Sequence, residues 1–138
     1  MIVLVDADVL LDVALDLRPH VGQSTDLLDS LERSSAAGFI AWHTVSNFYY
    51  LSVVRRGRPA ARQFVTELLA FINVAPTSTE DMRYAARLAM RDLEDAMQVA
   101  AARACKADVI ATRNVKDFHG SPIPAMKPAD IVSQLPTG

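Results

Sequence analysis

The sequence predicts an α/β layered domain with a mainly parallel central sheet, and three observations lead to this prediction. Short apolar runs with β-branched residues, IVLV at 2–5 and DVIA at 108–111, have the length and composition of buried strands. Segments with apolar residues at helical spacing alternate with them, as in parallel sheets covered by helices. The chain has 138 residues, 51% of them hydrophobic and 22% charged, so we expect one domain with a buried core over 1–138.

The first elements follow from apolar spacing and from residues that end helices. The strand at 2–5 leads into a short helix over 9–17, which stops near Pro19 because proline cannot continue a helix. From Ser24, leucines recur at helical spacing, and Gly38 is expected to stop this second helix.

The middle of the chain is expected to alternate in the same way. Residues 39–41 are a strand candidate. A helix over 43–56 carries apolar residues at spacings of three and four and stops at Gly57. Proline then opens a helix over 59–71, since proline is favoured in a first helical turn, and 73–75 is a strand fragment.

The last third begins with a helix start signal. Residues 78–81, Ser-Thr-Glu-Asp, form a good N-cap before a helix over 82–90. An amphipathic helix over 93–104 and a strand at 108–111 follow. We expect a loop, an edge strand and a terminal helix in 121–132.

Composition excludes several classes of protein. Charged residues interrupt every apolar run, so we expect no membrane span, and Asp6 comes too early for the basic start and apolar middle of a signal peptide. A single cysteine, Cys105, excludes an internal disulfide framework, and with three scattered histidines it cannot build a thiolate zinc site. These observations predict a cytoplasmic protein in a reducing compartment.

Carboxylates and amides follow the predicted strands at the points where the strands end. Asp6 comes directly after the first strand, Asn114 and Asp117 follow a later one, and Asp95 lies in the first turn of the helix over 93–104. Because the carboxyl ends of parallel strands meet at one edge of the sheet, these side chains are expected to share a pocket. Such oxygen ligands suit a hard cation such as Mg²⁺ or Mn²⁺, which would offset their repulsion.

Each of these residues also has a purely structural interpretation, and the alternatives stay open at this stage. Asp6 can cap the following helix, and Asp95 can take part in a capping box with Asp92 three residues earlier. Asp8 and Asp12 are expected at solvated positions of the first helix. Asn114 and Asp117 are residue types common in turns.

Four segments, in order, resemble PIN-domain proteins of the VapC-like kind: VDADVLLDVALDLRPH, WHTVSNFYYLSVVRRG, DLEDAMQVAAARACKADVIATRNVKDF and SPIPAMKPADIV. The resemblance covers almost the whole chain, and EDAxQ followed by TRNxKDF is its most specific part. It implies a three-layer α/β/α sandwich with an acidic metal pocket. It also implies Mg²⁺- or Mn²⁺-dependent RNA cleavage, usually by the toxin of a toxin–antitoxin pair.

The family's site carries over residue by residue. Its first acid falls on Asp6, its third on Asp95, and its fourth region on Thr112, Asn114 and Asp117. The resemblance thus implies metal ligands and a catalytic set, with further residues around them. The implied ligands are Asp6, Asp95 and Asp117; Asn114 joins them in the catalytic set, and Asp8, Asn47 and Thr112 support it.

The chain departs from the family at the second acid. Where members commonly have Glu in the helix that reads SNFYYL here, this chain has Asn47. Asparagine brings no negative charge to a metal and cannot act as a carboxylate base, so weaker metal binding is expected.

Arginine provides a candidate RNA-binding surface. Arg83, Arg87 and Arg91 recur every four residues and predict one basic stripe, and Arg113 of the TRN segment is added to this set. A solvated helix face explains the stripe equally well. A second basic cluster surrounds Gly57.

Two rival functions remain. Asp6-Ala7-Asp8-Val9 matches the Asp-x-Asp motif of haloacid-dehalogenase-type phosphatases, with Asp6 as nucleophile and Asp8 as acid/base, but the later lysine and paired acids of that family are missing. Alternatively, a PIN fold without its second acid serves as a binding module or antitoxin partner. The resemblance also implies a homodimer, with contacts through the aromatic and Arg-rich helices between Trp42 and Arg62.

Overall fold

The computed structural model describes residues 1–135, and in them one five-stranded sheet has only parallel neighbours. The strands stand in the order β3-β2-β1-β4-β5. Their bounds are β1 (Ile2–Val5), β2 (Ala37–Ile40), β3 (Ile72–Val74), β4 (Val109–Ala111) and β5 (Ala125–Met126). The predicted parallel α/β architecture is confirmed.

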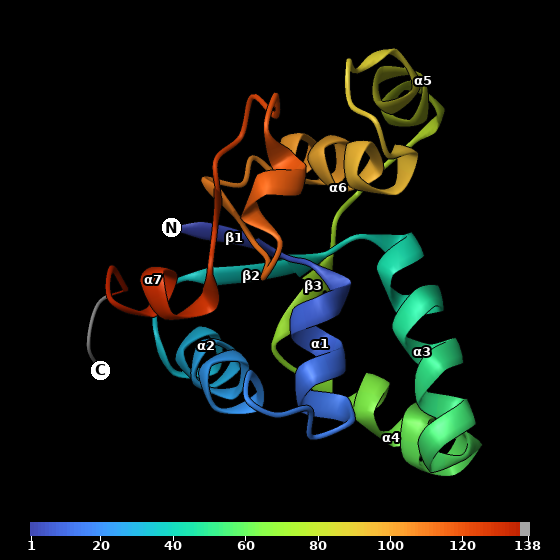
Figure 1. Cartoon of the computed structure of the whole chain (residues 1–138), viewed down its shortest axis with the longest axis vertical. Helices are drawn as coiled ribbons and strands as arrows, with labels where there is room; N and C mark the ends of the chain where they lie inside the picture. Colours follow the sequence, from blue (N-terminus) through green and yellow to red (C-terminus); the bar gives the residue numbers. More distant parts are fainter. Residues whose placement is uncertain (136–138) are drawn as a thin grey trace.

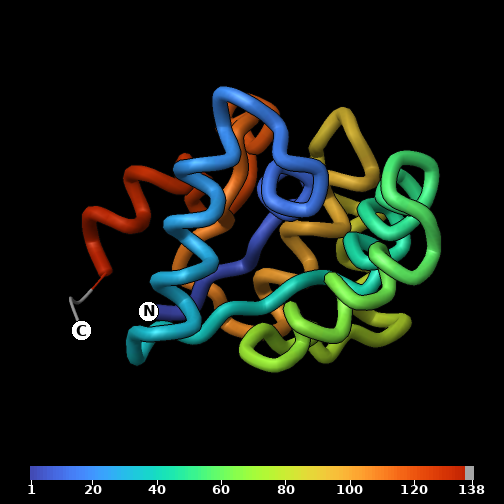
Figure 2. The backbone as a smooth tube through the Cα atoms, turned by 90° about the horizontal axis from the view of Figure 1, so that it is seen from below, coloured from blue at the N-terminus to red at the C-terminus, as the bar shows by residue number. Residues whose placement is uncertain are grey.

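Helices cover both faces of this sheet and make it the middle of three layers (Figure 1). One face carries α1 (Ala7–Ala14), α2 (Val21–Arg33), α3 (Trp42–Arg56), α4 (Arg58–Leu68) and α7 (Pro128–Val132). The other face carries α5 (Thr79–Arg87), α6 (Leu93–Ala104) and the short 3-10 helix η1 (Val115–Phe118). Figure 2 shows α1 between α2 and α3, with α7 beside α2. Among residues 1–135, no helix has both the length and the apolar character needed to cross a membrane.

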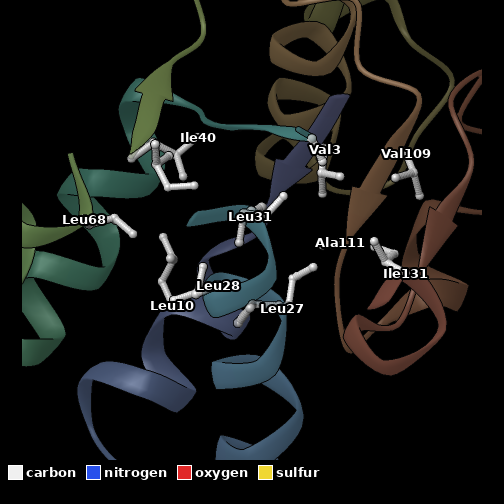
Figure 3. Packing of buried hydrophobic residues seen from close by; sticks show 14 of the residues in the cluster. Val3, Leu10, Leu27, Leu28, Leu31, Ile40, Leu68, Val109, Ala111 and Ile131 are labelled. Atoms are coloured by element: carbon white, nitrogen blue, oxygen red, sulfur yellow. The ribbon is translucent and has the colours of Figure 1, made fainter. Parts of the chain in front are cut away.

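The central strand β1 is buried on both sides. Val3 and Val5 belong to the apolar cluster on the α1/α2 face, in which Figure 3 shows Val3, Leu10 and Ile131. Leu4 packs with Val99 in the cluster on the α6 face. Successive side chains of a strand point to opposite faces, so a strand between two helical layers must be apolar throughout. This is why the IVLV run does not alternate with polar residues.

The order of the strands reverses beside β1. The chain runs from β1 through β2 to β3 on one side and then returns to place β4 on the other side of β1. The backbone N–H of Asp6 donates to the carbonyl of Ala111 over 2.9 Å, which joins the carboxyl ends of β1 and β4. In open parallel sheets ligands bind in the crevice at this reversal point.

Several predicted boundaries need correction. The first helix begins at Ala7 and ends at Ala14, earlier than the predicted 9–17. Gly38 does not stop a helix: α2 ends at Arg33, and Gly38 lies in β2, where a Cβ would collide with the side chains of Ile72 and Leu31. Gly57 does end α3 as predicted, at a φ of 82° that favours glycine.

Candidate functional site

Asp6 occupies the end of β1 and caps α1 at the same time. Its Oδ1 accepts from the backbone N–H of Ala7 over 2.8 Å and from Nε2 of Gln98 over 3.1 Å, and its Oδ2 accepts from Oγ1 of Thr112 over 2.9 Å. Burial raises the pKa of Asp6, these hydrogen bonds oppose the rise, and the negative charge of Asp117 adds to it. Capping and a role in the site therefore do not exclude each other.

Asp8 is half-buried and bound to the loop after β4. Its Oδ2 lies 3.2 Å from Oγ1 of Thr112, whose single hydroxyl proton it shares with Asp6, and it accepts from the backbone N–H of Arg113 over 3.0 Å and from Nδ2 of Asn114 over 3.1 Å. Its Oδ1 is buried without a hydrogen-bond partner. Burial, followed by the charge of Asp6, raises the pKa of Asp8 to about 6. The expectation that Asp8 is a solvated helix residue is therefore wrong.

Asp12, one helical turn beyond Asp8, is fully buried, so the same expectation is wrong for it. Its Oδ2 accepts from Oγ of Ser24 over 2.8 Å and lies 2.9 Å from Nε of Arg113. This ion pair turns the Arg113 guanidinium towards α1. The predicted RNA contact at Arg113 is not favoured by that orientation.

Asp95 and Asp117 line an open pocket of about 570 Å³ with the cationic side chains Arg91 and Lys116. The N-cap Asp92 uses its Oδ1 to accept from the backbone N–H groups of Glu94 and Asp95, over 2.7 and 3.3 Å, so the cap is Asp92 itself. Burial, and then the charges of Asp92, Asp6 and Asp117, raise the pKa of Asp95 to about 6. Asp6, Asp95 and Asp117 thus repel one another across the reversal point.

One observation favours the binding of a divalent cation at this site, and another does not. The donors are hard carboxylate oxygens, and burial first, with neighbouring carboxylates second, raises the pKa values of Asp6, Asp8 and Asp95, so a bound cation would offset an unfavourable charge there. Within residues 1–135, however, no three acidic, histidine or cysteine side chains are close enough to form a ready metal cluster. The chemistry fits a cation, and holding one requires the carboxylates to draw closer together.

The predicted arginine stripe is not continuous. α5 ends at Arg87, and a non-helical segment separates it from Arg91. Arg83 pairs with Glu80 on the exposed side of α5, and Arg87 is exposed in its last turn. Of these three arginines, Arg91 is the one that lines the acidic pocket.

Two buried residues of the site, Gln98 and Thr44, were not predicted as site residues. Nε2 of Gln98 donates to Oγ1 of Thr44 over 2.6 Å as well as to Asp6, so it joins α3 and α6 to β1. Its position three residues after Asp95, in the motif EDAxQ, places it on nearly the same side of α6 and is the signal that was available. Asn47 lies one turn beyond Thr44 in α3, half-buried.

The raised carboxyl pKa values predict an unusual pH dependence for the metal-free protein. Asp8 and Asp95 hold protons up to a pH of about 6 when folded and release them near 3.8, their ordinary value, when unfolded. The folded state binds more protons between these values, so the free energy of unfolding should fall as pH rises from 4 to 6. His43, whose pKa burial lowers, acts in the opposite direction.

Denaturant titrations in EDTA at pH 4 and pH 6 measure this dependence. Asp8→Asn removes one of the three carboxyl groups with a raised pKa and should flatten this dependence, while the contribution of His43 stays in both proteins. Equal slopes for the wild type and Asp8→Asn would contradict the prediction.

Comparisons with known proteins agree with this fold. A family model described as a PIN domain matches residues 2–116. VapBC2 from Rickettsia felis, solved bound to a DNA fragment from its promoter, superimposes with a TM-score of 0.72 at 15% identity, covering 92% of this chain and 98% of that one. VapC20 of Mycobacterium tuberculosis, a toxin that cleaves the sarcin–ricin loop, gives 0.69 at 16% identity, covering 86% and 95%. VapBC-1 from nontypeable Haemophilus influenzae gives 0.71 at 14%, covering 93% and 98%. No curated protein matches the sequence.

Proposed function

This chain belongs to the PIN-domain family, and from that premise we propose that it is a metal-dependent endoribonuclease of the VapC-like kind, the toxin of a toxin–antitoxin pair. RNA as substrate and an antitoxin as partner are suggested by the similar folds of VapC20, a toxin that cleaves the sarcin–ricin loop, and of VapBC2 and VapBC-1.

One observation supports the proposal most directly. The charge of Asp117 adds to the raised pKa of Asp6, and the charges of Asp6 and Asp117 add to the raised pKa of Asp95, beside a pocket that also carries Arg91 and Lys116. Cations at the pocket wall suit the phosphates of RNA, and the uncompensated carboxylates suit a metal ion. A purely structural cluster of acids would not need an open pocket.

In this proposal one group of residues would bind the metal ion and another would orient the metal ligands. Asp6, Asp95 and Asp117 would hold Mg²⁺ or Mn²⁺, which supplies charge neutralisation, a polarised phosphoryl oxygen and hydroxide near neutral pH. Thr112 and Gln98 hold the Asp6 carboxylate in one orientation through their hydrogen bonds. Asn114, in the loop after β4, is joined to α1 by the hydrogen bond from its Nδ2 to Asp8.

Arg91 and Lys116 would bind phosphates beside the scissile bond, because both line the pocket of Asp95 and Asp117. The phosphatase alternative fits less well. Both carboxylates of its motif, Asp6 and Asp8, already accept hydrogen bonds from Thr112, the residue that would bind phosphate there.

Cleavage of a mixed set of structured RNAs with Mn²⁺, and with EDTA as control, tests the proposal. Asn47→Glu would restore a charge that family members commonly have, and we expect it to tighten Mn²⁺ binding and raise the rate. A gain of about tenfold corresponds to 1.4 kcal/mol, a modest value for one added charge beside a dication. If the wild type and Asn47→Glu are both inert with Mn²⁺, the PIN fold serves here as a binding module.

We also propose that the protein is a homodimer, from the outer side of α3. Val54 lies four residues after Tyr50 and three after Leu51, so the three side chains share one side of the helix. Tyr50 is 71% exposed, Leu51 47% and Val54 74%. An apolar helix face of this kind commonly marks an interface. Light scattering should give a dimer for the wild type and a monomer for Val54→Glu. A wild-type monomer at tens of micromolar would contradict the proposal.

A further inference from the structure

A second, smaller pocket of about 190 Å³ lies between the start of α3, α5 and α6. Its lining includes the apolar side chains of Trp42, Met82 and Met97. His43 and Asp81 add polar groups to it. Pockets for whole drug-sized ligands measure roughly 300–1,000 Å³. This pocket therefore suits a single flat ring system rather than a larger molecule or a helix.

Trp42 gives the pocket a stacking surface. It is the only tryptophan of the chain, and it is 75% exposed in the first turn of α3. Met82, on α5 at the same pocket, is 39% exposed. A large exposed aromatic ring beside a small pocket is the arrangement on which unpaired nucleobases stack.

The polar groups of the pocket suit the edge of such a base. Asp81 accepts from the backbone N–H of Ser78 through Oδ2, over 2.8 Å, and its Oδ1 makes no hydrogen bond among the described residues. That free oxygen can accept from a ring N–H or an amino group. His43, half-buried beside Trp42, can donate or accept.

The small pocket is physically joined to the acidic site through α6. Along this helix Asp95 lines the large pocket, Met97 lines the small one, and Gln98 donates to Asp6. The next residue after His43 is Thr44, which accepts from the same Gln98 over 2.6 Å. Asp95 and Met97 are two residues apart and point to different sides of α6, so an RNA strand that crosses the acidic site reaches Trp42 by passing around this helix.

We propose that this pocket binds one unpaired nucleobase of the RNA substrate, stacked on Trp42 with its edge towards Asp81 and His43. The inference rests on the proposed function, because it assumes that RNA occupies the acidic site. It gives that site a preference for single-stranded segments, since a base must leave its helix to reach the pocket.

The single tryptophan makes the binding measurable without catalysis. We would follow Trp42 fluorescence in EDTA while titrating a single-stranded RNA hexanucleotide, an abasic oligonucleotide of equal length and a duplex of the same sequence. The expected result is quenching by the single-stranded RNA alone. Met82→Glu keeps the reporter and places a charge at the pocket, so it should weaken the quenching about tenfold.

Trp42→Ala tests the same contact by competition for a labelled RNA, with Leu69→Ala as the control. Leu69 is an exposed apolar residue at the end of α4, 45% exposed, and it belongs neither to the pocket nor to the proposed dimer face of α3. Affinity should fall about tenfold for Trp42→Ala and stay unchanged for Leu69→Ala. Both side chains are exposed, so both variants should fold.

Three results would overturn the inference: equal quenching by the abasic oligonucleotide, equal losses in the two alanine variants, or emission that shifts with protein concentration alone. The last would place a second copy of the chain on Trp42. The proposed function fails independently, when no RNA is cleaved with Mn²⁺. Cleavage without base-dependent quenching would leave the enzyme standing and remove the base pocket.

Discussion

Replacing Asp6 with Asn is expected to abolish Mn²⁺-dependent RNA cleavage while the fold stays intact. Asp6 interacts with every other part of the site. Thr112 and Gln98 donate hydrogen bonds to its carboxylate. The charges of Asp95 and Asp117 repel that carboxylate. Loss of a residue that merely orients a metal ligand costs about 10–100-fold. Loss of the ligand itself should therefore cost at least about 100-fold.

The substitution preserves the local hydrogen bonds. Asparagine keeps one oxygen to accept from Ala7 and Gln98, and its amide can donate to Oγ1 of Thr112, which then donates to Asp8. Because the pKa of Asp6 is raised, its charged form is disfavoured in the folded state, and removing that charge should leave the melting temperature similar or higher.

Cleavage assays with Mn²⁺ and melting curves in EDTA measure the two halves of this prediction. Asp26→Asn is the matched control, because Asp26 is an exposed residue of α2 and lies outside the site. Full activity in Asp6→Asn would remove Asp6 from the catalytic set. A large fall in melting temperature would show that its cap to α1 matters more than its charge.

Replacing Arg113 with Met should lower the free energy of unfolding by about 3 kcal/mol. Asp12 is fully buried, and Arg113 supplies the positive charge 2.9 Å from it. Removing one partner of a buried ion pair typically costs about 3–5 kcal/mol, because the other charge stays buried alone. We expect the lower end of that range, since the Arg113 side chain is 28% exposed.

A double-mutant cycle separates the lost pair from the lost packing. Asp12→Asn combined with Arg113→Met removes both charges, keeps an acceptor for Ser24 and should recover most of the stability. Urea titrations of the wild type, the two single variants and the double variant give the coupling energy. Additive losses would show that the pair contributes nothing beyond its separate side chains.

Sequence patterns were sufficient to predict the fold and to predict that Asp6, at the end of β1, lies beside the loop after β4. A fully apolar run must be buried on both faces, and the carboxyl ends of parallel strands share one edge, so Asp6 and the Thr112–Asn114 loop had to meet. These inferences depend only on local composition and on general rules of topology. The positions of Asp95 and Asp117 beside one pocket follow from the same rules.

The buried positions of Asp8 and Asp12 could not be predicted in the same way. An acid one turn apart from another on a helix normally faces water, and nothing nearby in the sequence says otherwise. Here α1 lies between α2 and α3, and the partners of both acids come from the distant residues Ser24, Arg113 and Asn114. Only the tertiary arrangement places them there.

The basic stripe was wrong for a different reason. Residues 83–91 keep helical spacing, and no glycine or proline interrupts them. The helix nevertheless ends at Arg87, and Leu88, beyond it, packs into the cluster under α5 and α6. Arg91 therefore lies beyond the helix, where it lines the acidic pocket.

The return of the chain to place β4 beside β1 also has a consequence for biosynthesis. The hydrogen bond between Thr112 and Asp6 spans 106 residues of sequence, and Asp95 and Asp117 likewise come late. A nascent chain that has emerged as far as β3 carries Asp6 without any of these partners. If the protein cleaves RNA as proposed, the ribosome that makes it meets no nuclease until the chain has left the exit tunnel as far as Asp117.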